Sequence, residues 1–272
     1  MRNPVSKTNI FTFIFYAVLI VAALVLTSCS SGIEVMSSHN GSPIQINGER
    51  SDWAGNLVQS DDKKVAFGFR NDQEFLYLLV TTGDRATAMK MLLQGMTVRI
   101  KSDNGEELGI RYPMKPLPED IREIRGIGNK DEQPGLEKFV HELKKVNDQI
   151  QVVTMDDYPV YTSGATQGKS LKGSFGMSDG LFVVEMQIPL TGDEIAGRLF
   201  PQYPQNILIN FTTGKPDFQG FRPEGGEGKE GGNGGMSRGG RRGNRGGERP
   251  GGGGDRPDFK PVDQSFRVKI VK

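Results

Sequence analysis

The stretch Val65-Ala66-Phe67-Gly68-Phe69-Arg70-Asn71-Asp72-Gln73-Glu74-Phe75-Leu76-Tyr77-Leu78-Leu79-Val80, residues 65–80, decides the fold class of this chain. Its two runs, 65–69 and 75–81, are rich in apolar, aromatic and β-branched residues, and the segment 70–74 between them is polar. Such runs predict β-strands, and the polar segment has the length and composition of a hairpin loop. The stretch therefore predicts an antiparallel β-hairpin.

Further strand-like runs continue this pattern toward the C-terminus, at 96–101, 107–112, 149–155, 172–176, 181–188, 206–212 and 264–271. Turn signals separate them, most clearly at 103–105 and 177–180, where Asn, Asp and Gly accept positive φ. Many short strands with turns between them favour a sandwich over alternating strands and helices. The predicted fold class is all-β, a jelly-roll-like antiparallel β-sandwich.

One short helical insertion is expected at about 113–147. Between residues 134 and 147, apolar residues recur at helical spacing, at Leu136, Phe139, Val140, Leu143 and Val146. This spacing predicts one apolar face of an amphipathic helix. We favour a helix that covers one end of the sandwich, and a partner-binding helix is the alternative.

The block 221–257 contains sixteen glycines, eight Lys or Arg residues and five Asp or Glu residues. This composition cannot bury enough apolar surface to order itself, so we predict a disordered Gly/Arg-rich loop before the last strand. The alternative is a nucleic-acid-binding segment. It is disfavoured because aromatic residues that could stack on bases are absent from 225–257. We therefore expect no nucleic-acid partner.

The N-terminus carries a targeting signal. Arg2 and Lys7 precede an apolar run at 10–26, and the run ends in Leu26-Thr27-Ser28-Cys29, with the only cysteine of the chain. This order predicts a secretory signal peptide at 1–28, and the ending resembles the lipobox of bacterial lipoproteins. A transmembrane helix is disfavoured because small residues and a polar segment follow the run. Cys29 is therefore expected to be acylated and to attach the protein to the lipid bilayer.

The predicted organisation follows from these segments. Residues 29–43 form a flexible tether, and residues 44–220 plus 258–272 form a single β-sandwich domain. The expected location is the cell envelope, lipid-anchored, and the outer membrane if the cell has two membranes.

Composition limits the chemistry of the chain. Lys plus Arg total 34 and Asp plus Glu total 33, so no strong overall charge attracts an acidic partner. Two histidines and one cysteine cannot supply a His/Cys metal cluster. No catalytic constellation is present, so we expect a protein that is not an enzyme and needs no cofactor or metal.

Local motifs occur in a recognisable order. Residues 44–53 (IQINGERSDW) resemble the opening motif of the family 9 carbohydrate-binding modules and their DOMON-like relatives, with Asn47 where Asp is usual. Residues 65–80 resemble a hairpin of that superfamily, and Asp84 follows where those domains often have an aspartate. Residues 181–190 resemble its strand that ends in Ile-Pro, which gives Pro189 a structural role, and 206–212 resemble the next strand. The resemblance implies a jelly-roll-like sandwich and a non-catalytic ligand-binding domain.

The resemblance implies a glycan or an envelope protein as possible partner. In sugar-binding members tryptophans hold the saccharide, but the single tryptophan here, Trp53, lies in the opening motif. We favour a packing role for Trp53, because a large aromatic residue in an opening strand usually packs. The candidate aromatic ligand platform consists of Tyr112, Tyr158, Tyr161 and Tyr203.

The family leaves other functions open. Haem-binding relatives use Met with His or Lys, for which His141 and Met114 are the candidates here. Some relatives bind calcium, for which Asp52, Asp72 and Asp84 are the candidates, although turn carboxylates of this kind are usually solvated. The alternatives to ligand binding are thus an enzymatic or electron-transfer module and a purely structural envelope protein.

Overall fold

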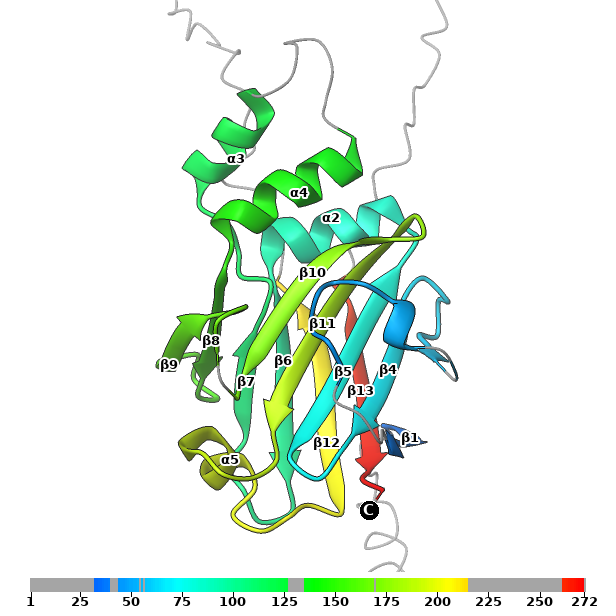
Figure 1. Cartoon of the computed structure of the whole chain (residues 1–272), viewed down its shortest axis with the longest axis vertical. Helices are drawn as coiled ribbons and strands as arrows, with labels where there is room; N and C mark the ends of the chain where they lie inside the picture. The colour runs from blue at the N-terminus through cyan, green and yellow to red at the C-terminus, as the bar shows by residue number, and fades with distance from the viewer. Residues whose placement is uncertain are drawn as a thin grey trace, which may run out of the picture.

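The computed structural model describes residues 32–39, 44–53, 55, 57–126, 135–168, 170–214 and 261–271. Two β-sheets pack face to face, with helices at the ends (Figure 1), which confirms the predicted all-β sandwich. The predicted signal peptide, Cys29 and the Gly-rich block lie outside the described residues. Within the described part, no helix is long and apolar enough to cross a membrane.

The larger sheet has seven strands. In spatial order they are β1 (Ile33–Met36), β13 (Asp263–Lys269), β12 (Asn206–Thr213), β6 (Met96–Ser102), β7 (Leu108–Arg111), β8 (Gln149–Val153) and β9 (Pro159–Gly164). The predicted strands of this sheet are found within a few residues of their expected bounds. Strand β9 was not predicted, because its sequence, Pro-Val-Tyr-Thr-Ser-Gly, has little apolar alternation.

The smaller sheet has six strands. They are β10 (Lys172–Ser178), β11 (Leu181–Pro189), β5 (Phe75–Thr82), β4 (Ala66–Asn71) and β2 (Ser38–His39), with β3 (Val58–Gln59) paired to β4. The predicted hairpins are present in it. Ser178 pairs with Leu181, so β10 and β11 are joined by Asp179 and Gly180 alone. Their φ angles of 51° and 76° are those of a tight type I′ turn, which favours Asp and Gly.

The N-terminal segment corrects two predictions. Strand β1 pairs in parallel with β13, and β2 pairs in parallel with β4, so both sheets are mixed rather than purely antiparallel. Residues 33–39 therefore belong to the sandwich and not to a flexible tether. The segment reaches both sheets because a buried serine, Ser37, joins β1 to β2. Its Oγ donates to Asn71 Oδ1 (2.5 Å) and accepts from the backbone N of Val271 (3.2 Å).

The helices also differ in number from the prediction. The expected insertion contains α3 (Pro118–Gly126) and α4 (Leu136–Val146), and Phe139, Val140 and Leu143 of α4 are buried. Two further helices, α2 (Arg85–Gln94) and α5 (Glu194–Leu199), were missed, as was the short 3-10 helix η1 (Ser51–Trp53). Periodicity does not predict helix α2, because its apolar residues do not form a single stripe along the helix. Helices α2, α3 and α4 lie together at one end of the sandwich, and α5 lies at the other (Figure 1).

The main core fills the space between the sheets. Phe67 of β4 contacts Phe211 of β12 and Phe266 of β13, each with ring centroids 4.8 Å apart. These residues come from alternate positions of their strands, as expected for side chains that point to the inner face. A second, smaller cluster lies on the outer face of the six-stranded sheet and includes Trp53 and Ile44.

Candidate functional site

The two outer sheet faces differ in exposure, and this difference places the candidate site. On the six-stranded sheet, Tyr77, Leu79 and Val183 point outward but are fully buried, because Ile44, Ile46, Trp53 and Leu57 pack over them. On the seven-stranded sheet, the outward residues of β6, such as Thr97 and Arg99, are partly exposed and polar. The face of the seven-stranded sheet is therefore the one open to a ligand.

The segment that covers the smaller sheet is held by a buried carboxylate. Glu185 of β11 is fully buried, and its Oε1 accepts a hydrogen bond from Trp53 Nε1 at 2.6 Å. Its Oε2 accepts from the backbone N of Gly48 at 2.7 Å and of Asn47 at 3.0 Å. The Trp53 ring is 2% exposed and lies on Gly68, where a Cβ would come within 2.8 Å of the ring. Trp53 is thus a packing residue in the described structure.

The surroundings of Glu185 shift the pKa of its carboxyl group. Burial raises the pKa of Glu185, and the hydrogen bonds from Trp53, Gly48 and Asn47 oppose this rise without cancelling it. Lys144 of α4 donates from Nζ to the backbone O of Asn47 at 3.0 Å. Burial lowers the pKa of Lys144, and the negative charges of Glu185 and Glu49 act against that change. This arrangement fastens α4 and the opening motif to the sheet.

The loop between β8 and β9 folds over the open face of the seven-stranded sheet. Thr154 N donates to Tyr158 O at 2.9 Å, and Asp157 N donates to Thr154 O at 3.1 Å. Asp157 has a φ of 64°, a left-handed conformation that Asp adopts more readily than most residues. The turn directs the carboxylate of Asp157 toward two arginines of the sheet.

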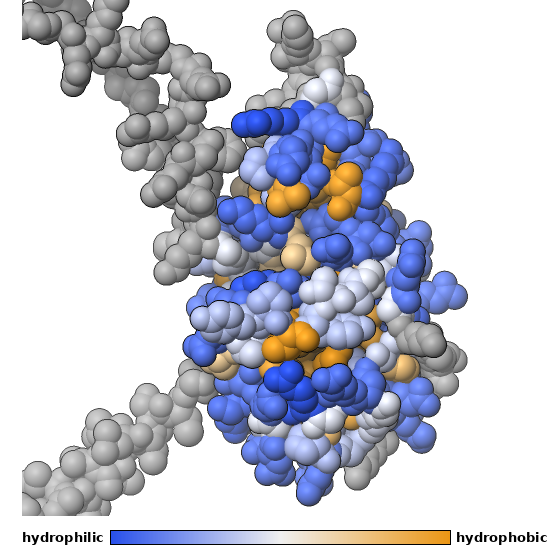
Figure 2. All heavy atoms as spheres, turned by 90° about the vertical axis from the view of Figure 1, so that its left-hand side faces the viewer, coloured by the Kyte–Doolittle hydropathy of each residue, from blue (hydrophilic) through white to orange (hydrophobic). Residues whose placement is uncertain are grey.

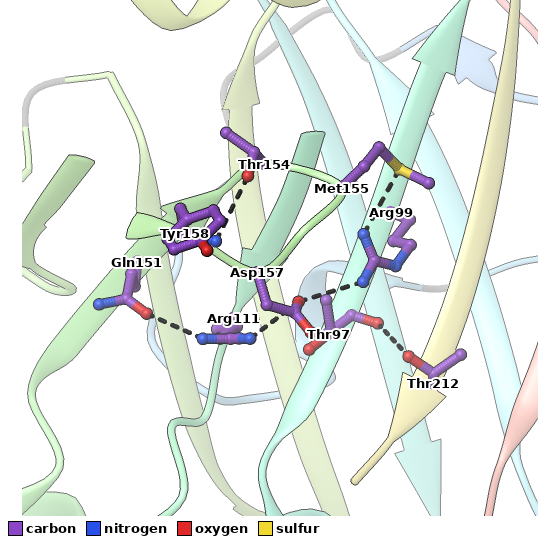
Figure 3. Close-up of polar contacts among 9 residues, drawn as sticks. All are labelled: Thr97, Arg99, Arg111, Gln151, Thr154, Met155, Asp157, Tyr158 and Thr212. Carbon is purple, nitrogen blue, oxygen red and sulfur yellow. Dashed lines mark hydrogen bonds and ion pairs between the residues drawn. The ribbon is translucent and has the colours of Figure 1, made fainter. Parts of the chain in front are cut away.

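These residues form a polar group that we call the Asp157 cluster: Arg99, Arg111, Gln151, Asp157 and Tyr158. Asp157 Oδ1 forms an ion pair with Arg99 Nη2 at 3.1 Å and another with Arg111 Nη2 at 2.8 Å. Arg111 Nη1 also donates to Gln151 Oε1 at 3.3 Å. Figure 3 shows Asp157 between the two arginines, with Tyr158 next to it in the same loop. The cluster orients guanidinium, carboxylate and amide groups from β6, β7, β8 and the loop between β8 and β9.

The ion pairs of the cluster contribute little to stability. The side chain of Asp157 is 55% exposed, and exposed ion pairs contribute about 0–1 kcal/mol each. Met155 also contacts the cluster, because Arg99 Nη1 donates to its sulfur at 3.5 Å. The guanidinium groups are thus held in fixed positions at the surface, where they can contact a ligand.

Tyr158 adds an aromatic surface to the cluster. Its side chain is 69% exposed, and Tyr161 on β9 is 41% exposed. Figure 2 views this side of the molecule, where small apolar areas lie among mostly hydrophilic residues. Of the four tyrosines predicted as a platform, the structure brings only these two to the same exposed edge.

The other two predicted tyrosines occupy different places. Tyr112 is 1% exposed and packs against Phe175 in the core with ring centroids 5.8 Å apart, so the prediction that it binds a ligand is wrong. Burial raises the pKa of its hydroxyl far above the usual range. Tyr203 lines a hollow of about 610 Å³ beside α5, at the other end of the molecule, and its hydroxyl donates to the backbone O of Asp72 at 3.3 Å. Pro189 is the last residue of β11 and pairs with Phe75.

The three calcium candidates each have a local structural role. Asp52 accepts from the backbone N of Gln45 at 3.2 Å, and Asp72 accepts from the backbone N of Phe75 at 2.7 Å within the hairpin loop. Asp84 accepts from the backbone N of Thr87 at 2.9 Å and begins α2. Asp72 and Asp84 lie at opposite ends of β5, so these residues do not come together.

The haem candidates also lie apart from the Asp157 cluster. His141 is exposed on α4, and Met114 is partly buried between β7 and α3, where its backbone O accepts from Asn147. Within the described residues, no group of three or more His, Cys, Asp or Glu side chains is placed to hold a metal ion.

Sequence reasoning missed the polar part of the cluster. The alternation in β6 and β7 indicates that Arg99 and Arg111 face outward, but no local pattern shows that both meet Asp157, 58 residues away from Arg99 in the chain. Only the pairing of β6 with β7 and of β7 with β8 brings them together.

Comparison with known proteins gives a distant likeness. No protein-family model matches this chain. No curated protein matches it either. Among solved structures, the chain is similar to a family 9 carbohydrate-binding module from Caldicellulosiruptor kristjanssonii in complex with glucose, at a TM-score of 0.32 and 13% identity over 66% of this chain and 77% of that chain. It is also similar to such a module from that organism in complex with cellotriose, at a TM-score of 0.31 and 15% identity over 67% of this chain and 76% of that chain. Values this low transfer neither a binding site nor a ligand.

Proposed function

We propose that this protein is a lipid-anchored, non-catalytic lipoprotein of the cell envelope that binds a glycan at the Asp157 cluster. The observation that carries the proposal is the ordered group of Arg99, Arg111, Gln151 and Asp157 beside the exposed ring of Tyr158. A sugar presents hydroxyl groups that both donate and accept hydrogen bonds, and a C–H face that packs on an aromatic ring. The cluster offers partners for both.

The choice of a glycan over another small ligand also rests on sequence. The motifs at 44–53, 65–80 and 181–190 resemble those of family 9 carbohydrate-binding modules. The cluster does not have the arrangement of an enzyme, because its single carboxylate is held between two guanidinium groups rather than beside a nucleophile. The order of charge, apolar run and cysteine at the N-terminus supports the lipid anchor.

Binding to a glycan array, followed by titration of the best glycan against the purified full chain in detergent, tests this proposal. Asp157→Asn should weaken binding because it releases both arginines, and Tyr158→Ala should weaken it because it removes the aromatic surface. We expect each change to raise Kd by about tenfold or more, which corresponds to about 1.4 kcal/mol.

A matched control is available at the end of the sandwich that carries α5. Glu106 forms an ion pair with Arg198 at 2.6 Å, and the side chain of Glu106 is 55% exposed, as is that of Asp157. Glu106→Gln therefore removes an ion pair of similar exposure and should leave Kd unchanged. Equal Kd values for wild type and Asp157→Asn, or binding of no glycan on the array, would refute the proposed site.

A further inference from the structure

The predicted lipid-bearing residue lies only a few residues before the folded domain. Strand β1 begins at Ile33, and Gly32 already lies against β13, since a Cβ there would come within 3.4 Å of the backbone of Phe266 and Arg267. Three residue steps separate Gly32 from Cys29, and they span at most about 10 Å when fully extended. A lipid on Cys29 would therefore hold the β1 edge of the domain close to the bilayer.

The attachment of this edge to the sandwich is firm. Ser37 is 2% exposed, and its backbone N donates to the backbone O of Lys269 at 3.0 Å. Its hydroxyl links it to Asn71 of the six-stranded sheet. Strand β1 forms the edge of one sheet and β2 forms the edge of the other, so the N-terminal segment lines the same side of both.

The Asp157 cluster lies on the half of the larger sheet that is farther from β1, from the central strand β6 to the loop before β9. The strand order runs β1-β13-β12-β6-β7-β8-β9, and the loop that carries Asp157 joins β8 to β9. Spacings between neighbouring strands place β6 about 14 Å and β9 about 29 Å from β1, and the cluster extends between these distances. Figure 1 shows β9 and β1 on opposite sides of the molecule.

We infer that the anchored domain stands edge-on, with the β1 and β2 edges against the lipid surface and the β9 edge, with Asp157 and Tyr158, directed away from it. This inference rests on the proposed lipid anchor. The bound glycan would then lie some tens of ångströms above the bilayer. A headgroup of the same leaflet would be too far from the site to be the ligand.

The chemistry of the β1 edge suits a lipid surface. Met36 is 68% exposed and pairs in register with Lys269, which places an apolar side chain beside a cation. Arg267 also faces the same way as Lys269, since alternate residues of a strand share a face, and it pairs in register with the exposed acid Glu34 of β1. Met36 beside Lys269 is therefore the part of this edge that combines an apolar side chain with a cation, as an anionic membrane surface favours.

Quenching by a labelled membrane tests this orientation. The chain has one cysteine, Cys29, so acylation leaves introduced cysteines as the only thiols. Met36→Cys on β1 and Val160→Cys on β9 would each carry a thiol-reactive fluorophore in the full acylated chain. The proteins would be reconstituted in phosphatidylglycerol-containing vesicles whose headgroups carry a nitroxide quencher. We expect several-fold stronger quenching at position 36 than at position 160.

A longer tether provides the control. An insertion of about 12 Gly and Ser residues before Gly32 adds a flexible segment with a root-mean-square span of about 19 Å, which frees the domain to rotate. The contrast between the two positions should then fall. Equal quenching at both positions with the native tether, or stronger quenching at position 160, would overturn the inference, as would a mass that shows Cys29 to be unacylated. Glycan binding is measured separately in detergent, so failure of the site and failure of the orientation are distinguishable.

Discussion

Glu185 shows how one residue connects distant parts of this chain. Three donors meet its carboxylate: Trp53 Nε1 and the backbone N atoms of Asn47 and Gly48. A buried charge of this kind persists only when hydrogen bonds satisfy it. The opening motif thus owes its position on the sheet to a residue more than 130 positions later in the chain.

Glu185→Gln should destabilise the protein by about 1–3 kcal/mol, because the amide has one acceptor oxygen for three donors and leaves a buried donor unsatisfied. The free energy of unfolding from urea titration measures this change. Trp53, the only tryptophan, reports the transition by fluorescence, and its buried ring should emit at short wavelength in the folded state. An unchanged midpoint and unchanged emission in the variant would contradict the role assigned to Glu185.

The same substitution should also change how stability depends on pH. Because the pKa of Glu185 is raised from 4.5, the folded protein binds this proton more tightly than the unfolded chain does. The contribution of Glu185 is therefore fully present below pH 4.5 and is lost as the pH rises through the folded pKa. The difference in stability between wild type and Glu185→Gln should be largest at low pH and smaller at neutral pH. A difference that grows with pH would contradict the raised pKa.

At the scale of elements, helix α2 shows how a single cap defines a helix that periodicity does not reveal. Asp84 Oδ2 accepts from both the backbone N and the hydroxyl of Thr87, at 2.9 and 2.6 Å. The hydrogen bond from the Thr87 side chain is the main cause that lowers the pKa of Asp84. The aspartate considered as a calcium ligand is thus the N-cap of α2.

Asp84→Ala should cost about 0.5–2 kcal/mol of stability, the usual effect of losing an N-cap side chain. Asp61, exposed in the loop before β4, provides the control, because Asp61→Ala should change stability by no more than about 0.5 kcal/mol. Thermal unfolding with and without calcium measures both effects. A midpoint that rises with calcium in wild type but not in Asp84→Ala would instead favour a metal-binding role.

At the scale of the whole molecule, the connection between β12 and β13 carries the Gly-rich block. The two strands are hydrogen-bonded neighbours, with Thr212 opposite Asp263, so the ends of this connection are held together by the sheet. The entropic cost of closing a loop grows only as the logarithm of its length. The domain can therefore carry a long insertion at this place.

Replacing residues 221–257 with a short linker should leave the domain folded and shift Tm by only a few degrees, which corresponds to about 1 kcal/mol of loop-closure free energy. A variant in which the same residues are shuffled keeps the length and composition and should match the wild type. Loss of cooperative unfolding in the shortened variant would mean that the block packs against the domain.

The sequence by itself determined the long strands of both sheets, the hairpins, the amphipathic helix α4 and the sandwich class, because each depends on patterns within about ten residues. The hairpin of 65–80 and the turn at Asp179-Gly180 are encoded locally in this way. The sequence also supports the prediction of a lipid anchor at Cys29, which remains to be tested.

Only the tertiary structure decided which residues meet. Arg99, Arg111 and Asp157 converge because three strands pair side by side, and Tyr112 is buried because it faces Phe175 across the core. Residues 33–39 join both sheets through parallel pairing. Nothing in the local sequence of these seven residues indicates their distant partner strands. Contacts between residues far apart in the chain depend on strand order and register, and a single sequence read locally does not contain these distances.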